Sequence, residues 1–259
     1  MNVKAAFFDI DNTLYNWKKK EFVASGIEAI KALKKQGVKV FLASARPYHS
    51  QVEFGTFDLG IKWDGYISSA GAIATVGRKY VLKILMEEKD VRKLCRYALK
   101  NSLTMEVVTP KSRFLIAPGN EYLERYHADY ADIVPPIRKY SHGQCTGTLL
   151  FAPDIHDEEL KELLPHLCFY RFHGYGLDIM PSQHLKGEGI SCILNELGIK
   201  KDEAISFGDD YQDISMRDAS FFVAMGNGRE EVKEAADYVT DPIGEDGLAN
   251  ALYKLGVLR

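Results

Sequence analysis

Apolar and polar residues alternate in blocks along the first part of the chain, and these blocks predict strands and helices in turn. Residues 3–10 are almost continuously apolar, as expected of a short strand buried on both faces of a parallel sheet. Apolar residues at helical spacing then predict a helix over residues 21–36, and Gly37 supplies its C-terminal stop. Two more short runs, residues 38–43 and Gly65–Ser68, predict the next strands.

The C-terminal part repeats this alternation, whereas the middle of the chain has a different pattern. The C-terminal pattern predicts a helix over residues 187–197 and strands over residues 204–207, 221–224 and 238–240. Between about residues 80 and 178, helical patterns mix with β-rich runs. The predicted helices there are 87–100 and 157–164, and the predicted strands are 104–108, 146–151 and 168–172.

Strands that alternate with helices indicate βαβ units and a parallel sheet. We therefore predict an α/β fold, with a Rossmann-like parallel-sheet core and an inserted α+β domain. The predicted division assigns residues 1–79 and 181–259 to the core and residues 80–180 to the insertion.

Composition narrows the possible functions only a little. The chain has 259 residues, of which 46% are hydrophobic and 27% charged, so a disordered or fibrous protein is not expected. With a net charge of -3, the chain lacks the excess of positive charge expected of a protein that binds nucleic acid or an anionic membrane. We see no signal peptide and no apolar run of the roughly 20 residues that span a bilayer, so a cytosolic location is expected. The four cysteines form no CxxC pair, which predicts neither a zinc site nor a disulfide framework.

Two aspartates end the first predicted strand, at the edge of an α/β sheet where ligands bind. Side chains two residues apart on an extended segment point the same way, so Asp9 and Asp11 are expected to face one site. Carboxylates this close repel unless a cation or a shared proton offsets them, and a divalent metal is the simplest solution. Capping of the strand-to-loop junction is the alternative, and it explains one aspartate better than two.

Further polar groups follow other predicted elements. Ser44 ends the second strand, where its hydroxyl either holds a phosphate oxygen or caps a turn. Lys186 begins a helix, where a cation opposes the helix dipole unless an anion is bound there; a solvated surface lysine is the alternative. Asp209, Asp210 and Asp213 follow another strand, and three acids exceed what an acidic helix start requires. Such hard oxygen ligands suit Mg²⁺.

Taken together, these clusters resemble the motifs of the haloacid dehalogenase (HAD) superfamily, and within it the Cof-like sugar-phosphatase group with a large inserted α+β cap (type IIB). The resemblance covers nearly the whole chain. The first motif appears as Asp9, Asp11 and Thr13, the second as Ser44, the third as Lys186, and the fourth as Asp209 and Asp213. The stretches Met180-Pro181 and residues 223–227 are also typical of this group. The order and spacing of the four motifs are more specific than any single motif.

The sequence departs from the group's usual pattern at several positions. Asn12 replaces a frequent Gly, Ser44-Ala45-Arg46 replaces Thr-Gly-Arg, and Gln212 replaces a frequent Asn. Residues 70–72 also lack an Asn that often precedes Gly71. No catalytic group is lost, so these departures concern the subfamily and its substrate.

The resemblance implies a phosphatase that acts in two steps. Asp9 would attack phosphorus to form an aspartyl-phosphate that water then hydrolyses, and Asp11 would serve as general acid and base. Mg²⁺ would be held by Asp9, Asp209 and the backbone carbonyl of Asp11. The resemblance also places Ser44, Lys186 and Asn12 at the phosphoryl group, with Asp213 binding the metal through water or orienting Lys186. Supporting positions are Thr13, Asp210 and Arg46.

The sequence alone also fits other functions. A phosphomutase of the same superfamily would return the phosphoryl group to its substrate. A receiver-type signalling module also gathers acids, a hydroxyl and a lysine, but such modules are about half this length. A non-catalytic metabolite-binding protein is a further alternative. The substrate would be a small phosphorylated metabolite chosen by the cap, where candidate residues are Arg113, Tyr140, His142, His173 and Tyr175.

Overall fold

A computed structural model describes residues 1–130, 133–172, 174–181 and 186–258. The chain forms two compact units. The first comprises Met1–Arg46, Gly55–Lys83 and His184–Arg259, and the second comprises Pro47–Phe54 and Ile84–Gln183.

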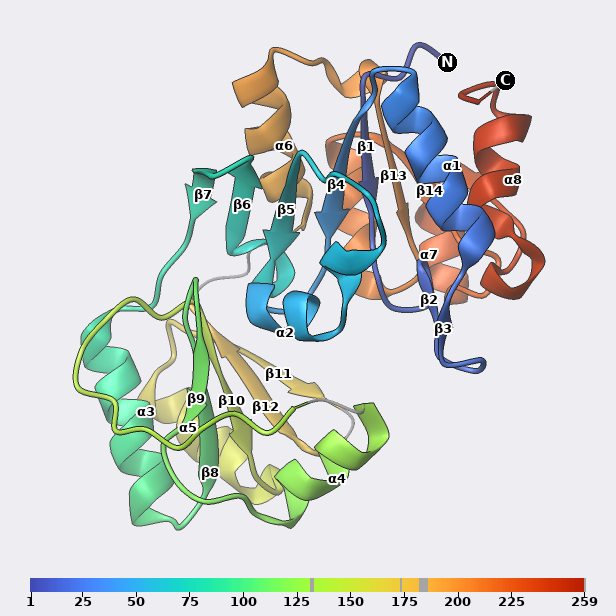
Figure 1. Ribbon diagram of the computed structural model, residues 1–259. Helices are drawn as coiled ribbons and strands as arrows, with labels where there is room; N and C mark the ends of the chain where they lie inside the picture. The colour runs from blue at the N-terminus through green and yellow to red at the C-terminus, as the bar shows by residue number, and fades with distance from the viewer. Residues whose placement is uncertain (131–132, 173, 182–185, 259) are drawn as a thin grey trace. The chain divides into compact units, whose positions relative to one another are not determined.

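An eight-stranded sheet forms the centre of the first unit (Figure 1). Six neighbouring strands run parallel, and β6 and β7 extend the sheet in antiparallel fashion. In spatial order the strands are β15 (Tyr238–Val239), β14 (Phe221–Ala224), β13 (Ala204–Gly208), β1 (Ala5–Phe8), β4 (Lys39–Ala43), β5 (Gly65–Ser68), β6 (Ile73–Val76) and β7 (Lys79–Lys83). The α/β fold class predicted from the alternation of elements is confirmed.

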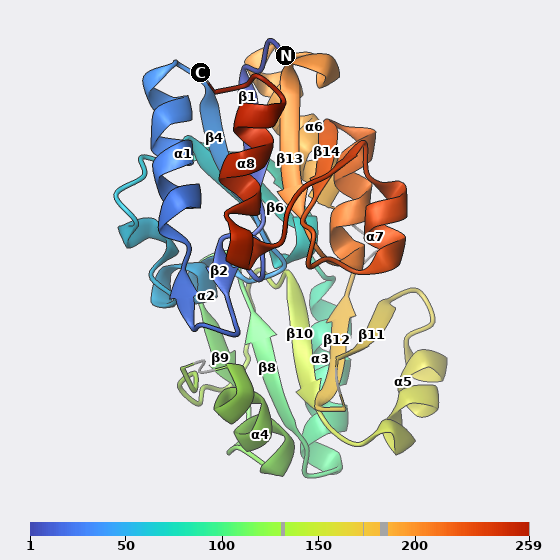
Figure 2. The same ribbon diagram turned by 90° about the vertical axis from the view of Figure 1, so that its right-hand side faces the viewer.

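Helices cover both faces of this sheet. The helices α1 (Ala24–Lys35) and α8 (Gly247–Lys254) lie side by side on one face (Figure 2). The other face packs against α6 (Lys186–Leu197), α7 (Glu230–Ala235) and the 3₁₀ helix η5 (Tyr211–Asp218). Residues of β1 point alternately to these two layers, so its four residues are all buried.

The second unit is built on a five-stranded antiparallel sheet. Its strands in spatial order are β11 (Cys168–Phe172), β12 (Gly176–Met180), β10 (Gly147–Phe151), β8 (Thr104–Val108) and β9 (Arg113–Leu115). The helices α3 (Glu88–Lys100) and α5 (Asp157–Leu163) share a core with one face of the sheet. Leu123 of α4 (Glu121–Tyr130) packs in a smaller cluster with Leu115 and Phe151. The short helix α2 (Tyr48–Glu53) also belongs to this unit.

One predicted boundary is wrong for a physical reason. The helix expected over residues 21–36 begins at Ala24, because Glu21–Phe22 form the strand β3 and pair with β2 (Tyr15–Asn16). The remaining predicted helices and strands are present, within one or two residues at most ends. Among the described residues, no helix is long and apolar enough to cross a membrane.

Candidate active site

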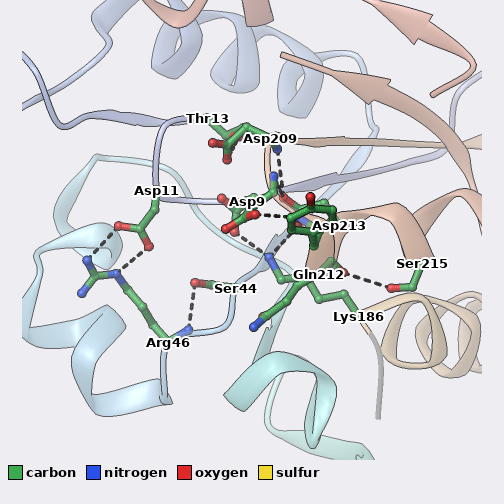
Figure 3. Close-up of polar contacts among 12 residues, drawn as sticks. Asp9, Asp11, Thr13, Ser44, Arg46, Lys186, Asp209, Gln212, Asp213 and Ser215 are labelled. Atoms are coloured by element: carbon green, nitrogen blue, oxygen red, sulfur yellow. Dashed lines mark hydrogen bonds and ion pairs between the residues drawn. The ribbon is translucent and has the colours of Figure 1, made fainter. Parts of the chain in front are cut away.

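Three of the predicted polar residues stand at the ends of three neighbouring strands. Asp9, Ser44 and Asp209 directly follow β1, β4 and β13. Phe8, the last residue of β1, is paired with Leu42 on one side and Phe207 on the other, and all three strands are parallel. Their carboxyl ends therefore meet at one edge of the sheet, as Figure 3 shows.

Lys186 joins two of the acids at this edge. Its Nζ donates to Asp9 Oδ1 at 2.7 Å and to Asp213 Oδ1 at 2.6 Å. All three residues are buried, and the lysine is only 2% exposed, so it is not a solvated surface residue. The first turn of α6 lies close against η5, because a Cβ on Gly187 would be 2.0 Å from the Ser215 carbonyl oxygen. Glycine at this position therefore lets the helix start deliver the ammonium group to the acids.

Asp213 shapes the loop that follows β13. Its Oδ2 accepts hydrogen bonds from the backbone N–H groups of Asp209, at 2.9 Å, and Asp210, at 3.0 Å. A Cβ on Gly208 would lie 2.4 Å from Asp213 Cγ, so only glycine lets this carboxylate fold back over the strand end. Asp213 thus fixes both the acidic loop and the ammonium group of Lys186.

The donor set at the strand ends fits a divalent cation. Asp9, Asp209 and Asp213 each offer a carboxylate oxygen, and these three oxygens lie within 4.8 Å of one another. The Thr13 hydroxyl donates to Asp209 Oδ1 at 3.5 Å, a long contact that links the first and fourth motifs. Carboxylate oxygens gathered in this way are the ligands that Mg²⁺ prefers.

Negative charge is crowded at this site, and the pKa values of two of its carboxyl groups are raised. Burial raises the pKa of Asp9 to about 8; the Lys186 ammonium opposes that rise, while the carboxylates of Asp213 and Asp11 add to it. Burial, followed by the charges of Asp9 and Asp213, raises the pKa of Asp209 to about 9. Burial by itself would lower the pKa of Lys186, but Asp213 and Asp9 outweigh it and raise the pKa, so the ammonium form persists. A single ammonium group does not offset all this charge, so the remainder is offset either by protons or by a bound cation.

Asp11 lies at the same edge, but its side chain is turned toward Arg46 (Figure 3). Arg46 Nε donates to Oδ2 and Nη2 donates to Oδ1, both at 2.8 Å, and Trp17 Nε1 also donates to Oδ1 at 2.8 Å. The expectation that the two side chains point the same way assumed a continued strand. The strand ends at Phe8, and a turn follows in which Asn12 has a φ of 54°.

Ser44 and Asn12 have backbone partners at this edge. The Ser44 hydroxyl is buried and accepts a hydrogen bond from the backbone N–H of Arg46 at 3.1 Å. The Asn12 carbonyl accepts from Asn227 Nδ2 at 3.0 Å. Asp210 caps η5 by accepting from the N–H of Tyr211 at 2.8 Å and pairs with Arg229 at 2.7 Å. Asp210 therefore has a structural role in the loop.

Residues 6–252 match the family model of the haloacid dehalogenase-like hydrolases. The chain belongs to this family. The chain is 29% identical over 262 residues to "Putative phosphatase YkrA" of Bacillus subtilis (strain 168), with both chains covered to 100%. It is 26% identical to "Phosphoglycolate phosphatase 1" of Saccharolobus solfataricus, covering 98% of this chain and 96% of that protein.

Solved structures similar to this HAD-like hydrolase agree with the family match. The HAD subclass IIB sugar phosphatase BT4131 is 31% identical, with a TM-score of 0.82, and the match covers 99% of this chain and 100% of that one. A protein from Geobacillus kaustophilus HTA426 is 29% identical with a TM-score of 0.88, over 99% and 100% of the two chains. The family, the hydrolase class and the phosphatase assignment expected from the motifs are confirmed.

The candidate cap residues of this HAD-like hydrolase have partners of their own. Arg113 is buried and pairs with Glu53 at 2.6 Å. The Tyr140 hydroxyl donates to the Gly143 carbonyl at 3.1 Å, His142 contacts Ser141, and Tyr175 donates to Asp129. His173 lies outside the described residues.

Sequence reasoning missed Trp17 and Asn227 as neighbours of the motif residues. Trp17 carries no motif signal, and its contact with Asp11 depends on the turn and the β2–β3 hairpin. Asn227 lies in the stretch 223–227 that is typical of the group, and this was the one available signal. Its Oδ1 accepts from the N–H of Ile243 at 2.7 Å while its amide group donates to Asn12, so it links two loops.

Proposed function

We propose that this phosphatase of the HAD-like family depends on Mg²⁺ and hydrolyses a small phosphorylated metabolite, a sugar phosphate, through an aspartyl-phosphate on Asp9. The observation that supports it most directly is the contact of Lys186 with both Asp9 and Asp213 beside Asp209. At this strand edge Asp9 would be the nucleophile, Lys186 the cation for phosphate, and the neighbouring acids the metal ligands. The sugar phosphatase BT4131 supports the substrate class.

Asp9 would supply the nucleophile. One carboxylate oxygen attacks phosphorus, the bond from phosphorus to the substrate oxygen breaks, and the displaced alkoxide takes a proton. Asp9, Asp209 and the Asp11 carbonyl would hold Mg²⁺, with Asp213 binding through water or acting only through Lys186. When bound, the ion offsets the charge of the carboxylates and of the phosphoryl oxygens.

The remaining polar groups would bind the phosphoryl oxygens and move the proton. Lys186 neutralises part of the charge that spreads over these oxygens, and Ser44 and Asn12 hold them in place. Asp11 would give its proton to the leaving oxygen and later remove one from the attacking water. Arg46 and Trp17 would orient its side chain for this role, through two hydrogen bonds to Oδ1 and one to Oδ2.

The chain's four cysteines are all unpaired. Unpaired thiols are typical of a reducing compartment, which supports a cytosolic location.

A substrate screen tests this function. Phosphorylated sugars, nucleotides and cofactors are offered to the purified protein with Mg²⁺, with Ca²⁺ and with excess chelator, and phosphate release is measured. We expect turnover with Mg²⁺ only, since Ca²⁺ tends to bind carboxylates through both oxygens and would occupy the oxygen that attacks. Asp9→Asn should abolish turnover, whereas Asp58→Asn, an exposed carboxylate of the first unit, should leave it unchanged.

Two outcomes would contradict the proposal. Full turnover in excess chelator would show that the reaction needs no metal ion. A rate of Asp9→Asn within about threefold of wild type would show that Asp9 is not the nucleophile. A requirement for a bisphosphate activator would instead indicate a phosphomutase.

A further inference from the structure

The second unit contains a groove that shares no residue with the acidic site. It has a volume of about 450 Å³ and lies between α3 and residues 137–140. Arg138 donates its backbone N–H to the Leu115 carbonyl at 2.8 Å, which ties the segment to the edge of β9. All residues that line the groove belong to the range Ile84–Gln183. The acidic site is built only from residues of the first unit.

The groove concentrates positive charge in a chain whose net charge is -3. Arg96, Arg138 and Lys139 line it, and no carboxylate is among the residues that line it. A fourth cation, Arg92, pairs with Glu88 at 2.9 Å. Within the part of the chain that the structure describes, no ion pair joins a carboxylate to the other three. Exposed cations grouped without carboxylates attract an anion that carries several charges.

Apolar side chains complete the groove. Leu99 is 56% exposed and Ile137 is 57% exposed, and Ile116 is half-buried beside them. The Cys95 thiol is buried, and burial, against the opposing charges of Arg92 and Arg96, raises its pKa to about 11, so it stays neutral. The groove therefore offers an apolar wall next to three cations. Inorganic phosphate would use the cations alone and leave this wall exposed.

We propose that this groove binds a nucleoside di- or triphosphate. The phosphates would lie against Arg96, Arg138 and Lys139, since guanidinium groups bind phosphate oxygens in pairs and lysine adds a point charge. The base would cover Leu99, Ile116 and Ile137. The volume lies in the range of small-molecule sites, roughly 300–1,000 Å³. This inference does not depend on the proposed phosphatase mechanism.

Binding is tested with ADP and ATP on the full chain in excess chelator, which suppresses metal-assisted binding at the acidic site. Isothermal titration calorimetry gives the affinity, and hydrogen exchange locates the ligand. We expect protection in peptides of α3 and of residues 136–140, and an affinity that falls as NaCl rises. Arg96→Gln and the double substitution Arg138→Gln/Lys139→Gln should each weaken binding about ten-fold or more. The matched control is Lys93→Gln, an exposed cation of α3 that does not line the groove.

These surface substitutions should fold, and thermal melts of each variant check this. The proposal is overturned if neither nucleotide binds at millimolar concentration, or if Lys93→Gln weakens binding as much as Arg96→Gln. Protection confined to peptides around Asp9 and Asp209 would assign the binding to the acidic site instead. Binding to vesicles of anionic lipid with no binding of either nucleotide would show that the groove recognises a membrane surface, which also overturns it.

Discussion

Arg46 holds Asp11 by a fork of two hydrogen bonds, with Nε 2.8 Å from Oδ2 and Nη2 2.8 Å from Oδ1. Trp17 adds a third donor, and its ring lies 5.9 Å from the Arg46 guanidinium carbon. The Arg46 guanidinium group therefore contacts both the Trp17 ring and the Asp11 carboxylate, and these contacts restrict all three side chains. The residue proposed to move a proton at the leaving group is thus held in one well-defined orientation.

The first prediction concerns Arg46. Arg46→Gln should lower turnover of a sugar phosphate by on the order of ten-fold or more, because Asp11 loses the partner that limits its orientations. Arg46→Lys should recover little, since an ammonium group cannot form the two-pronged contact. Steady-state kinetics with each variant measure the effect.

Trp17→Phe and Arg78→Gln supply the comparison for that series. Trp17→Phe keeps a ring beside Arg46 but removes one donor, so we expect a smaller loss than for Arg46→Gln. Arg78 is exposed in the first unit, and Arg78→Gln should match wild type. A folded Arg46→Gln protein with unchanged or faster turnover would show that the fork does not serve the reaction.

Much of the site could be predicted because the carboxyl ends of parallel strands meet. Asp9, Ser44 and Asp209 each follow an apolar run, and that rule alone places them together. The orientation of Asp11 could not be predicted in this way. Its partner Arg46 is 35 residues away, and the turn that redirects it contains a left-handed Asn12, which no periodic pattern reveals.

The fold shows the same division between periodic and irregular segments. Strands such as β8 and helices such as α3 carry clear apolar periods and were predicted with nearly correct bounds. Four helices were not predicted: α2, α4, α7 and α8. Of these, α2 and α7 have six residues each, too few to establish a helical period. The strand β12 was not predicted, because Gly176 and Asp178 are poor strand formers that interrupt its apolar run.

The second prediction concerns the pH dependence of metal binding. Metal ligands must be deprotonated, and in the metal-free protein the pKa values of Asp9 and Asp209 are raised to about 8 and about 9. Below these values protons compete with Mg²⁺. The affinity for Mg²⁺ should therefore rise as the pH increases through about 8 and about 9. Calorimetry in buffers with different ionisation enthalpies should also detect proton release. A constant affinity with no proton release would contradict these raised pKa values.

The third prediction concerns the stability of the metal-free protein. The pKa of Asp9 is raised from 3.8 to about 8 on folding, so between these values the native state binds a proton that the unfolded chain has lost. Stability from this group is therefore present at low pH and is lost as the pH rises toward about 8. Asp9→Asn cannot ionise, so in chelator it should melt above wild type at pH 8, and the difference should shrink toward pH 4. Melting curves across this range test it, with Asp58→Asn as the control; a wild-type advantage at pH 8 would contradict it.

The fourth prediction concerns Lys186. Lys186→Met leaves the buried carboxylates of Asp9 and Asp213 without their common partner, and loss of one member of a buried ion pair costs about 3–5 kcal/mol. The loss of unfolding free energy should be largest near pH 8 and smaller near pH 5, because the raised pKa of Asp9 lets that carboxyl take up a proton there. Adding Asp213→Asn should recover part of this stability without restoring turnover. Chemical denaturation of the single and double variants measures the coupling, and strictly additive effects would mean that the two residues do not interact.

The last prediction concerns Asp11 itself, because it separates phosphatase chemistry from acceptance of a phosphoryl group alone. If Asp11 protonates the leaving oxygen, Asp11→Asn should reduce turnover most for a sugar phosphate, whose alkoxide is a poor leaving group. p-Nitrophenolate departs with little help, so p-nitrophenyl phosphate should be affected less. General acid and base contributions are typically ~10²–10⁴-fold, so a difference of about ten-fold or more between the two substrates should be visible.

The same variant should also accumulate the intermediate. Asp9 and Lys186 remain in place, so the activated substrate can still transfer its phosphoryl group, but the attacking water has lost its base. Rapid quench with radiolabelled substrate should then detect phosphoenzyme that wild type does not accumulate. Arg78→Gln serves again as the surface control. Equal losses with both substrates and no trapped phosphoenzyme would mean that Asp11 acts only in the fork with Arg46 and Trp17, as a structural residue of the turn.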